Sequence, residues 1–176
     1  MNVRFLLYDI QSAVNLGQIL RLAETLQIGL EIFDPRDLLG NTENYKTVSD
    51  FSCGAFDRLV RTRLLDRHGL DSSLNNGRLI ATCVGKDAVS LPEFRFADND
   101  VVLFGNEYDG LPEEILKRAP VKLYVPLPPA ILGKPRSYMP IDPSKHKVEN
   151  EGIPNLSVSA TCAIVAYAVH LQRLNK

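Results

Sequence analysis

Residues 3 to 33 read VRFLLYDIQSAVNLGQILRLAETLQIGLEIF, and this stretch decides the fold class. Residues 3 to 8 are an apolar run typical of a buried strand. Residues 16 to 28 repeat apolar side chains at helical spacing, and residues 30 to 33 are a second apolar run that ends at Asp34-Pro35. The pattern predicts a strand, a helix and a second strand, the repeating unit of a parallel α/β sheet.

The remainder of the chain continues this alternation. Short apolar runs at residues 78–84, 101–104 and 121–125 predict further strands. Before them, a polar stretch over residues 41–52 leads to a predicted helix that runs through residue 67. Another helix is expected after Gly110, because Pro112 suits a first helical turn and two acidic residues follow it. Such strands, separated by helices, indicate a parallel sheet covered on both faces.

The composition fits one soluble domain spanning residues 1–176, since 45% of the residues are hydrophobic. Lys and Arg total 20 against 21 Asp and Glu, so any RNA contact must depend on local positive charge. Cys53, Cys83 and Cys162 lack the close spacing of metal ligands, and their odd number favours a reducing cytoplasm; we expect no metal. The sequence predicts neither a signal peptide nor a membrane span.

Two segments near the carboxyl terminus are unusual. The predicted last helix, residues 156–174, is apolar on almost every side and must therefore be buried on almost every side. Either the core of the domain encloses it or a second subunit packs on it, and we favour the second subunit. Residues 128–154 form a long irregular loop with six prolines and several basic residues. Loops of this length are functional or disordered, and the sequence leaves both possibilities open.

Asn15, Gly17 and Arg21 form the first of three candidate motifs. Asn15 stands where a side-chain oxygen would cap the first helix, and Gly17 is a small residue that a helix tolerates. An isolated Arg21 would ordinarily be a solvated charge. In the functional interpretation, Arg21 lies at the carboxyl edge of the sheet, where its guanidinium holds a phosphate and polarises a nearby hydroxyl group.

The second and third motifs have equally simple local explanations. Gly105-Asn106-Glu107 follows a predicted strand and Gly110 closes the turn, but Leu111-Pro112 replaces the Lys-Ser/Thr pair of a P-loop. Nucleoside triphosphate binding is thereby excluded, and the turn is either a plain connection or the wall of a nucleoside pocket. Pro154-Asn155-Leu156-Ser157 opens the last helix, as its cap or as another wall of that pocket.

Together the motifs resemble those of the TrmH-type, or SpoU, branch of the SPOUT RNA methyltransferases. The resemblance rests on their order: Asn15-x-Gly17-x-x-x-Arg21, then Phe104-Gly105-Asn106-Glu107-x-x-Gly110, then Val125-Pro126 with Asn155-Leu156-Ser157. It spans nearly the whole chain and is greatest to minimal members that act on the tRNA anticodon loop. It implies transfer of a methyl group from S-adenosylmethionine to a ribose 2′-hydroxyl of RNA, with tRNA as the expected substrate and no metal required.

The resemblance also implies a fold that periodicity cannot predict. The carboxyl-terminal part of the sheet would be tied in a deep trefoil knot, which the general rule against knotted chains would exclude. The knot loops would hold S-adenosylmethionine, and the protein would be an obligate homodimer. The apolar last helix would then contribute to the dimer interface.

By resemblance, the catalytic residues are Asn15, Arg21, Glu107 and Asn155. Arg21 would activate and position the 2′-hydroxyl, and the other three would organise that arginine and the ribose. The cofactor pocket would be formed by Thr82, Gly105, Val125, Leu127, Ile153, Leu156 and Ser157. Ile153 replaces a serine that is usual in the family, and the 128–154 loop is unusually long. The alternatives are therefore a non-catalytic RNA-binding member of the family and an rRNA 2′-O-methyltransferase.

Overall fold

The computed structural model describes residues 1–58, 60–83, 87–127 and 156–175. The strands within these ranges are β1 (Arg4–Tyr8), β2 (Gly29–Phe33), β3 (Thr62–Leu65), β4 (Arg78–Thr82), β5 (Val89–Ser90), β6 (Asp100–Phe104) and β7 (Val121–Tyr124). They pair in parallel in the order β3-β2-β1-β6-β4-β7-β5. The helices are α1 (Ala13–Thr25), α2 (Thr42–Ser52), α3 (Ala55–Arg58), α4 (Arg67–Leu74), α5 (Glu113–Arg118) and α6 (Val158–Leu174).

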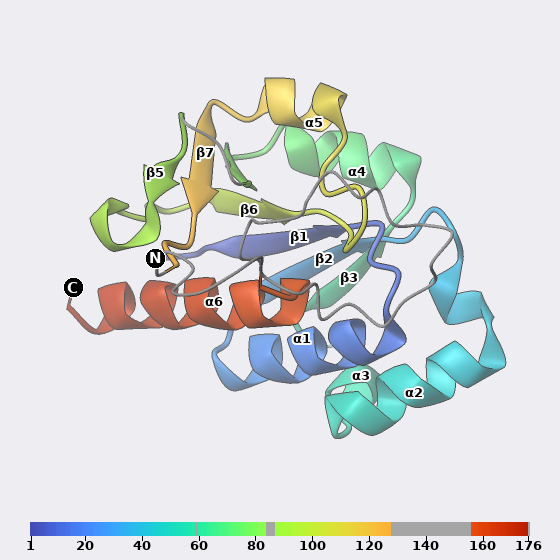
Figure 1. Ribbon diagram of the computed structural model, residues 1–176. Helices are drawn as coiled ribbons and strands as arrows, with labels where there is room; N and C mark the ends of the chain where they lie inside the picture. Colours follow the sequence, from blue (N-terminus) through green and yellow to red (C-terminus); the bar gives the residue numbers. More distant parts are fainter. Residues whose placement is uncertain (59, 84–86, 128–155, 176) are drawn as a thin grey trace, which may run out of the picture.

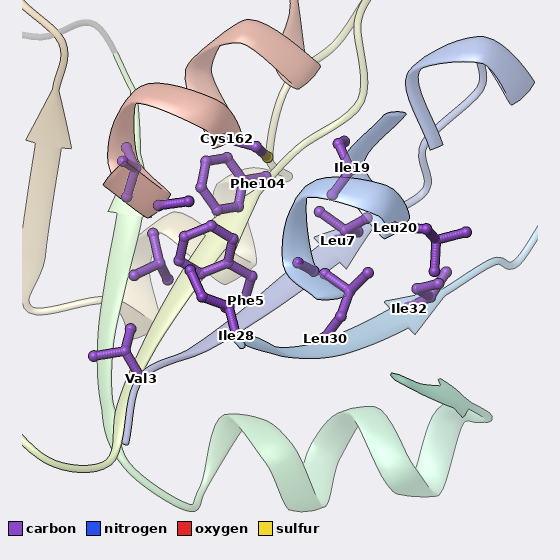
Figure 2. Close-up of a cluster of buried hydrophobic side chains, with 14 of the residues drawn as sticks. Val3, Phe5, Leu7, Ile19, Leu20, Ile28, Leu30, Ile32, Phe104 and Cys162 are labelled. Carbon is purple, nitrogen blue, oxygen red and sulfur yellow. The ribbon is translucent and has the colours of Figure 1, made fainter. Parts of the chain in front are cut away.

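Helices cover both faces of this sheet, as Figure 1 shows. The larger core lies under α1, α2, α3 and α6, where the rings of Phe5 and Phe104 pack 4.9 Å apart and Cys162 lies above them (Figure 2). The second core lies under α4 and α5 and includes Leu6 and Leu103. Successive residues of β1 thus enter opposite cores, which explains why this strand is a continuous apolar run.

The sequence predicted β1, β2, β4, β6 and β7 to within two residues of their observed ends. The boundaries expected for the first helix, 16–28, were wrong by three residues at each end. Ser12 begins α1 because its side chain accepts a hydrogen bond from the backbone N–H of Asn15 (3.3 Å). The chain leaves the helix at Gln27, which has a left-handed φ of 53°, before Ile28 enters the core.

The prediction of one helix that runs through Arg67 is wrong. The preceding polar stretch is itself the helix α2, begun by Asn41, whose side-chain oxygen accepts from two backbone N–H groups at 3.0 Å each. After the short helix α3 the chain forms β3, an edge strand paired only with β2 among the described strands. Only Leu65 of β3 is buried, so the strand lacks the apolar run that a local pattern would reveal.

The helix α6 is half buried and half exposed. Cys162, Val165, Ala166 and Val169 are fully buried against the larger core. Its other side carries an exposed apolar surface, the α6 stripe: Ile164 at 39%, Tyr167 at 56%, Leu171 at 42% and Leu174 at 68% exposure. The predicted burial on almost every side is therefore not achieved within one chain. No helix in the described ranges is long and apolar enough to cross a membrane.

The predicted 128–154 loop lies outside the described residues. The expected knot depends on how this segment joins β7 to α6, so the knot stays a prediction. What the structure shows is a seven-stranded parallel sheet flanked by helices, within the described ranges.

Candidate functional site

The sheet has a topological switch point between β1 and β6, neighbouring strands that are far apart in sequence. The chain builds β2 and β3 on one side of β1, whereas β4, β7 and β5 lie beyond β6. Parallel α/β sheets bind ligands outside the carboxyl ends of strands at such a point, because the connections leaving the two strands diverge there. The helix α1, which follows β1, and the loop that leaves β6 carry two of the three predicted motifs.

Glu107 anchors the loop after β6 to the start of α1. Its carboxylate accepts hydrogen bonds from the backbone N–H groups of Gln11 (3.0 Å) and Ser12 (3.2 Å) and from the side-chain amide of Asn15 (2.8 Å). Negative charge is favourable at this position, because the first N–H groups of a helix are partly positive and lack partners within the helix. With three donors bound, the carboxylate serves to organise the site.

Asn15 joins this anchor to α6. Its side-chain oxygen accepts a hydrogen bond from the hydroxyl of Ser159 (3.0 Å), while its amide donates to Glu107. We call this chain of contacts the Glu107–Asn15–Ser159 network. It connects residues 92 and 144 positions apart in sequence. Asn15 of the first motif, Glu107 of the second and Ser159, two residues beyond Ser157 of the third, therefore meet at one place.

Asn15 does not cap α1, because Ser12 does, and the local explanation for Asn15 is therefore wrong. Ser157 does cap α6, accepting from the N–H of Ala160 (3.2 Å), and its hydroxyl lies 3.1 Å from that of Ser159. Ser159 was missed by sequence reasoning. A serine in a first helical turn is ordinary, and only its contact with Asn15 distinguishes it.

Two motif glycines are required by close packing. A Cβ on Gly17 would lie 2.7 Å from the Cβ of Phe51 and 2.8 Å from the carbonyl oxygen of Val48, where α1 and α2 cross. Gly17 is therefore a packing requirement, and not merely a residue that the helix tolerates. A Cβ on Gly105 would collide with the backbone of Gly110, which folds back to pair with Asn106.

Arg21 lies apart from the Glu107–Asn15–Ser159 network. It is exposed on α1 and lines a hollow of about 320 Å³ together with Gln18, Leu22, Thr25 and Phe51. Within the described ranges, its guanidinium has no hydrogen-bond or ion-pair partner. The structure thus brings Asn15 and Glu107 into contact but leaves Arg21 in contact with neither.

Those predicted cofactor residues that the structure describes lie at or just after the carboxyl ends of strands and before α6. The hydroxyl of Thr82, the last residue of β4, donates to the carbonyl oxygen of Leu103 (2.8 Å), so it is engaged within the sheet. Val125, Leu127 and Leu156 are half-buried aliphatic residues in loops. Aliphatic surface beside the polar backbone of loops suits a nucleoside, so this set fits the adenosyl part of S-adenosylmethionine.

Ile153 and Asn155 lie outside the described residues. Their assigned roles, in the cofactor pocket and in catalysis, stay predictions.

The predicted helix through residue 67 would carry Arg58, Arg63 and Arg67 on one element, but the structure distributes them over several. Arg58 in α3 binds Glu24 (2.6 Å), and this hydrogen bond lowers the pKa of Glu24 and raises that of Arg58. Arg63 in β3 binds the buried carboxylate of Glu31 (3.1 Å). Arg67 begins α4 and is exposed. These residues therefore do not form a single basic helical face.

Comparisons with known proteins agree with these motifs. The model of the SpoU rRNA methylase family matches residues 2–132. A tRNA (cytidine(34)-2′-O)-methyltransferase of Ancylobacter novellus is 27% identical over 133 residues, 72% of this chain and 79% of that protein.

Two solved structures show the same fold. One, described as structural insights into the 2-OH methylation of C/U34 on tRNA, has a TM-score of 0.71 and 24% identity, covering 99% of this chain and 97% of that chain. An AdoMet-bound rRNA methyltransferase from Sinorhizobium meliloti has a TM-score of 0.71 and 15% identity, covering 97% of this chain and 56% of that chain.

Proposed function

Because the chain belongs to the SpoU rRNA methylase family, we propose that it transfers a methyl group from S-adenosylmethionine to a ribose 2′-hydroxyl of tRNA. The observation that carries the proposal is the Glu107–Asn15–Ser159 network at the switch point. The relative from Ancylobacter novellus, named for 2′-O-methylation of cytidine 34, supports tRNA as the substrate and nucleotide 34 as the target.

The main task of the protein in this reaction is to align the methyl group of the cofactor with the ribose oxygen. S-adenosylmethionine supplies an activated sulfonium methyl group, so no metal is needed. In the transfer, the ribose oxygen would bond to the methyl carbon as the bond from that carbon to the sulfonium sulfur breaks. S-adenosylhomocysteine would leave, and the hydroxyl proton would pass to water. The Glu107–Asn15–Ser159 network fixes α1, the loop after β6 and the start of α6 relative to one another. By resemblance, Asn155 is proposed to help organise the ribose.

Arg21 is proposed to hold a substrate phosphate and to stabilise negative charge that develops on the ribose oxygen. A guanidinium group keeps its proton in proteins, so Arg21 acts as a hydrogen-bond donor and positioning charge. The cofactor is proposed to lie against Gly105, Val125, Leu127, Ile153, Leu156 and Ser157, with Thr82 at the edge of the pocket.

The protein is proposed to act in the cytoplasm as a homodimer of single-domain, knotted subunits. The α6 stripe supports the dimer, because four large apolar side chains at helical spacing are exposed in the single chain. Arg21 is exposed on α1, which packs beside α6 (Figure 1).

A methylation assay tests this function. Tritiated S-adenosylmethionine, purified protein and total tRNA from cells that lack the protein are incubated, and the nucleosides are identified by mass spectrometry. We expect a 2′-O-methylated nucleoside with the wild type and none with Arg21→Ala, while S-adenosylhomocysteine binding to Arg21→Ala stays measurable by calorimetry. Full activity of Arg21→Ala would refute its role.

Two other outcomes would favour the alternatives. Methylation of rRNA with none in tRNA would show that the substrate class is wrong. A wild-type protein that binds RNA but neither S-adenosylmethionine nor S-adenosylhomocysteine would indicate a non-catalytic RNA-binding member of the family.

A further inference from the structure

Arg36 is an exposed arginine held at the carboxyl edge of the sheet by a buried carboxylate. Asp9, directly after β1, is only 6% exposed and has a left-handed φ of 57°, an uncommon conformation for a residue other than glycine. Both of its carboxylate oxygens accept from the Nε of Arg36 at 3.0 Å. The Arg36 side chain is nevertheless 56% exposed.

The way Arg36 binds Asp9 leaves both of its terminal nitrogens unused by any described residue. Arg78 neutralises the fully buried Asp100 through both Nε (2.8 Å) and Nη2 (2.7 Å), the usual two-point geometry. Arg36 uses Nε alone, and its two terminal nitrogens have no hydrogen-bond partner in the described part of the chain. Neutralising Asp9 therefore accounts for only one nitrogen of this guanidinium.

The turn that contains Arg36 is held by hydrogen bonds as well. Asp34, at the end of β2, accepts hydrogen bonds from the N–H groups of Leu38 (3.0 Å) and Leu39 (3.1 Å) through its carboxylate. Its carbonyl oxygen also accepts from the N–H of Asp37 (3.3 Å). A side chain held at both its backbone and its Nε has lost much of its conformational entropy before a ligand arrives, which favours binding.

Asn106 connects the Arg36–Asp9 pair to the proposed active site. Its side-chain amide donates to Asp9 (3.3 Å), and its oxygen accepts from the backbone N–H groups of Tyr108 (2.9 Å) and Asp109 (2.7 Å). Asn106 immediately precedes Glu107 in the loop after β6. The pair is thus attached to the same loop as the Glu107–Asn15–Ser159 network.

We propose that Arg36 binds a phosphate of the RNA substrate beside the target nucleotide, and that Asp9 is its positioning residue; this inference rests on the proposed function. Two free terminal nitrogens in a planar fork match two phosphate oxygens. The carboxylate of the cofactor is the competing anion, but β2 is separated from β4 by β1 and β6. Three strand spacings place those carboxyl ends roughly 14 Å apart, so Arg36 lies on the side away from the cofactor residues of β4 and β7.

Salt-dependent binding of radiolabelled total tRNA to the full chain tests the inference. Arg36→Gln is expected to weaken binding about fivefold to twentyfold at low salt and to reduce the slope of log affinity against log salt by about one, the effect of losing one phosphate contact. Arg36→Lys should keep the slope but lose part of the affinity, because the planar fork is gone. Asp9→Asn should weaken binding and keep the slope, since the charge of Arg36 remains.

Arg58→Gln is the matched control. Arg58 is 53% exposed and also paired with an acid, but both its Nε and Nη2 are bound to Glu24. Arg58→Gln changes the net charge of the protein by the same amount as Arg36→Gln, but it should leave the slope of log affinity against log salt unchanged. Circular dichroism melts and S-adenosylhomocysteine calorimetry show whether each variant is folded and whether its cofactor site is intact.

Equal slopes for Arg36→Gln and Arg58→Gln would overturn the inference. So would loss of S-adenosylhomocysteine binding by Arg36→Gln with unchanged tRNA binding, because the bound anion would then be the cofactor. If the variants behave as expected but the wild type methylates no RNA, the inference holds and the proposed function fails. A wild type that binds no tRNA overturns both.

Discussion

Glu107→Gln tests whether the contacts of Glu107 hold the site together. Glutamine has one acceptor oxygen, which at best keeps the bonds from Ser12 and Asn15, and its amide then faces the N–H of Gln11. Losing one hydrogen bond to a charged group costs about 1.5–3 kcal/mol, and losing negative charge at a helix start costs about 0.3–1 kcal/mol. Because the contacts are only partly buried, we expect the free energy of unfolding to fall by about 2 kcal/mol.

Urea unfolding followed by circular dichroism at fixed protein concentration measures this loss. With a denaturant slope of about 2 kcal/mol per molar, the midpoint should fall by about 1 M. Glu113→Gln is the control, since Glu113 also begins a helix but is 80% exposed and pairs with Lys117 one turn along α5; it should lower the free energy of unfolding by at most about 1 kcal/mol. A Glu107→Gln variant as stable as this control would refute the anchoring role.

Three further variants or reagents test other parts of the structure. Gly17→Ala forces a Cβ against α2 and should destabilise the protein by about 1–3 kcal/mol in urea unfolding, whereas the exposed Gln18→Ala should not. Tyr167→Glu places a charge in the α6 stripe and should convert the proposed dimer to a monomer in sedimentation; an unchanged mass would contradict the proposed interface. Burial raises the pKa of the Cys162 thiol well above its usual value, so little thiolate exists near neutral pH. At about pH 8 a thiol reagent should therefore modify the exposed Cys53 quickly and Cys162 only after unfolding.

The strands β1, β2, β4 and β6 were predictable because each buries successive residues and so appears as a mostly apolar run. The strand β3 was not, since three of its four residues are outside the core and its pairing with β2 is what makes it a strand. The polar helix α2 was missed for a related reason. Its mostly polar sequence buries little beyond Val48 and Ser52, so no apolar stripe marks it.

The candidate site also divides into what the local sequence indicated and what only contacts between elements decided. The residue types and order of the motifs indicated Asn15 and Glu107, but local reasoning took Asn15 for a helix cap and Gly17 for a tolerated residue. Their roles depend on partners in other elements: Glu107 and Ser159 for Asn15, and the backbone of α2 for Gly17. No local pattern reports such partners.

The sequence by itself determined the parallel α/β class, the apolar last helix and the three motifs, because periodicity and residue order are properties of short segments. Only the tertiary structure decided that the motifs meet at the switch point, that one side of α6 stays exposed, and that Asp9 holds Arg36 through a single nitrogen. The physical reason is that apolar periodicity reports how deeply a segment is buried. Which residue it meets there depends on how the whole chain packs.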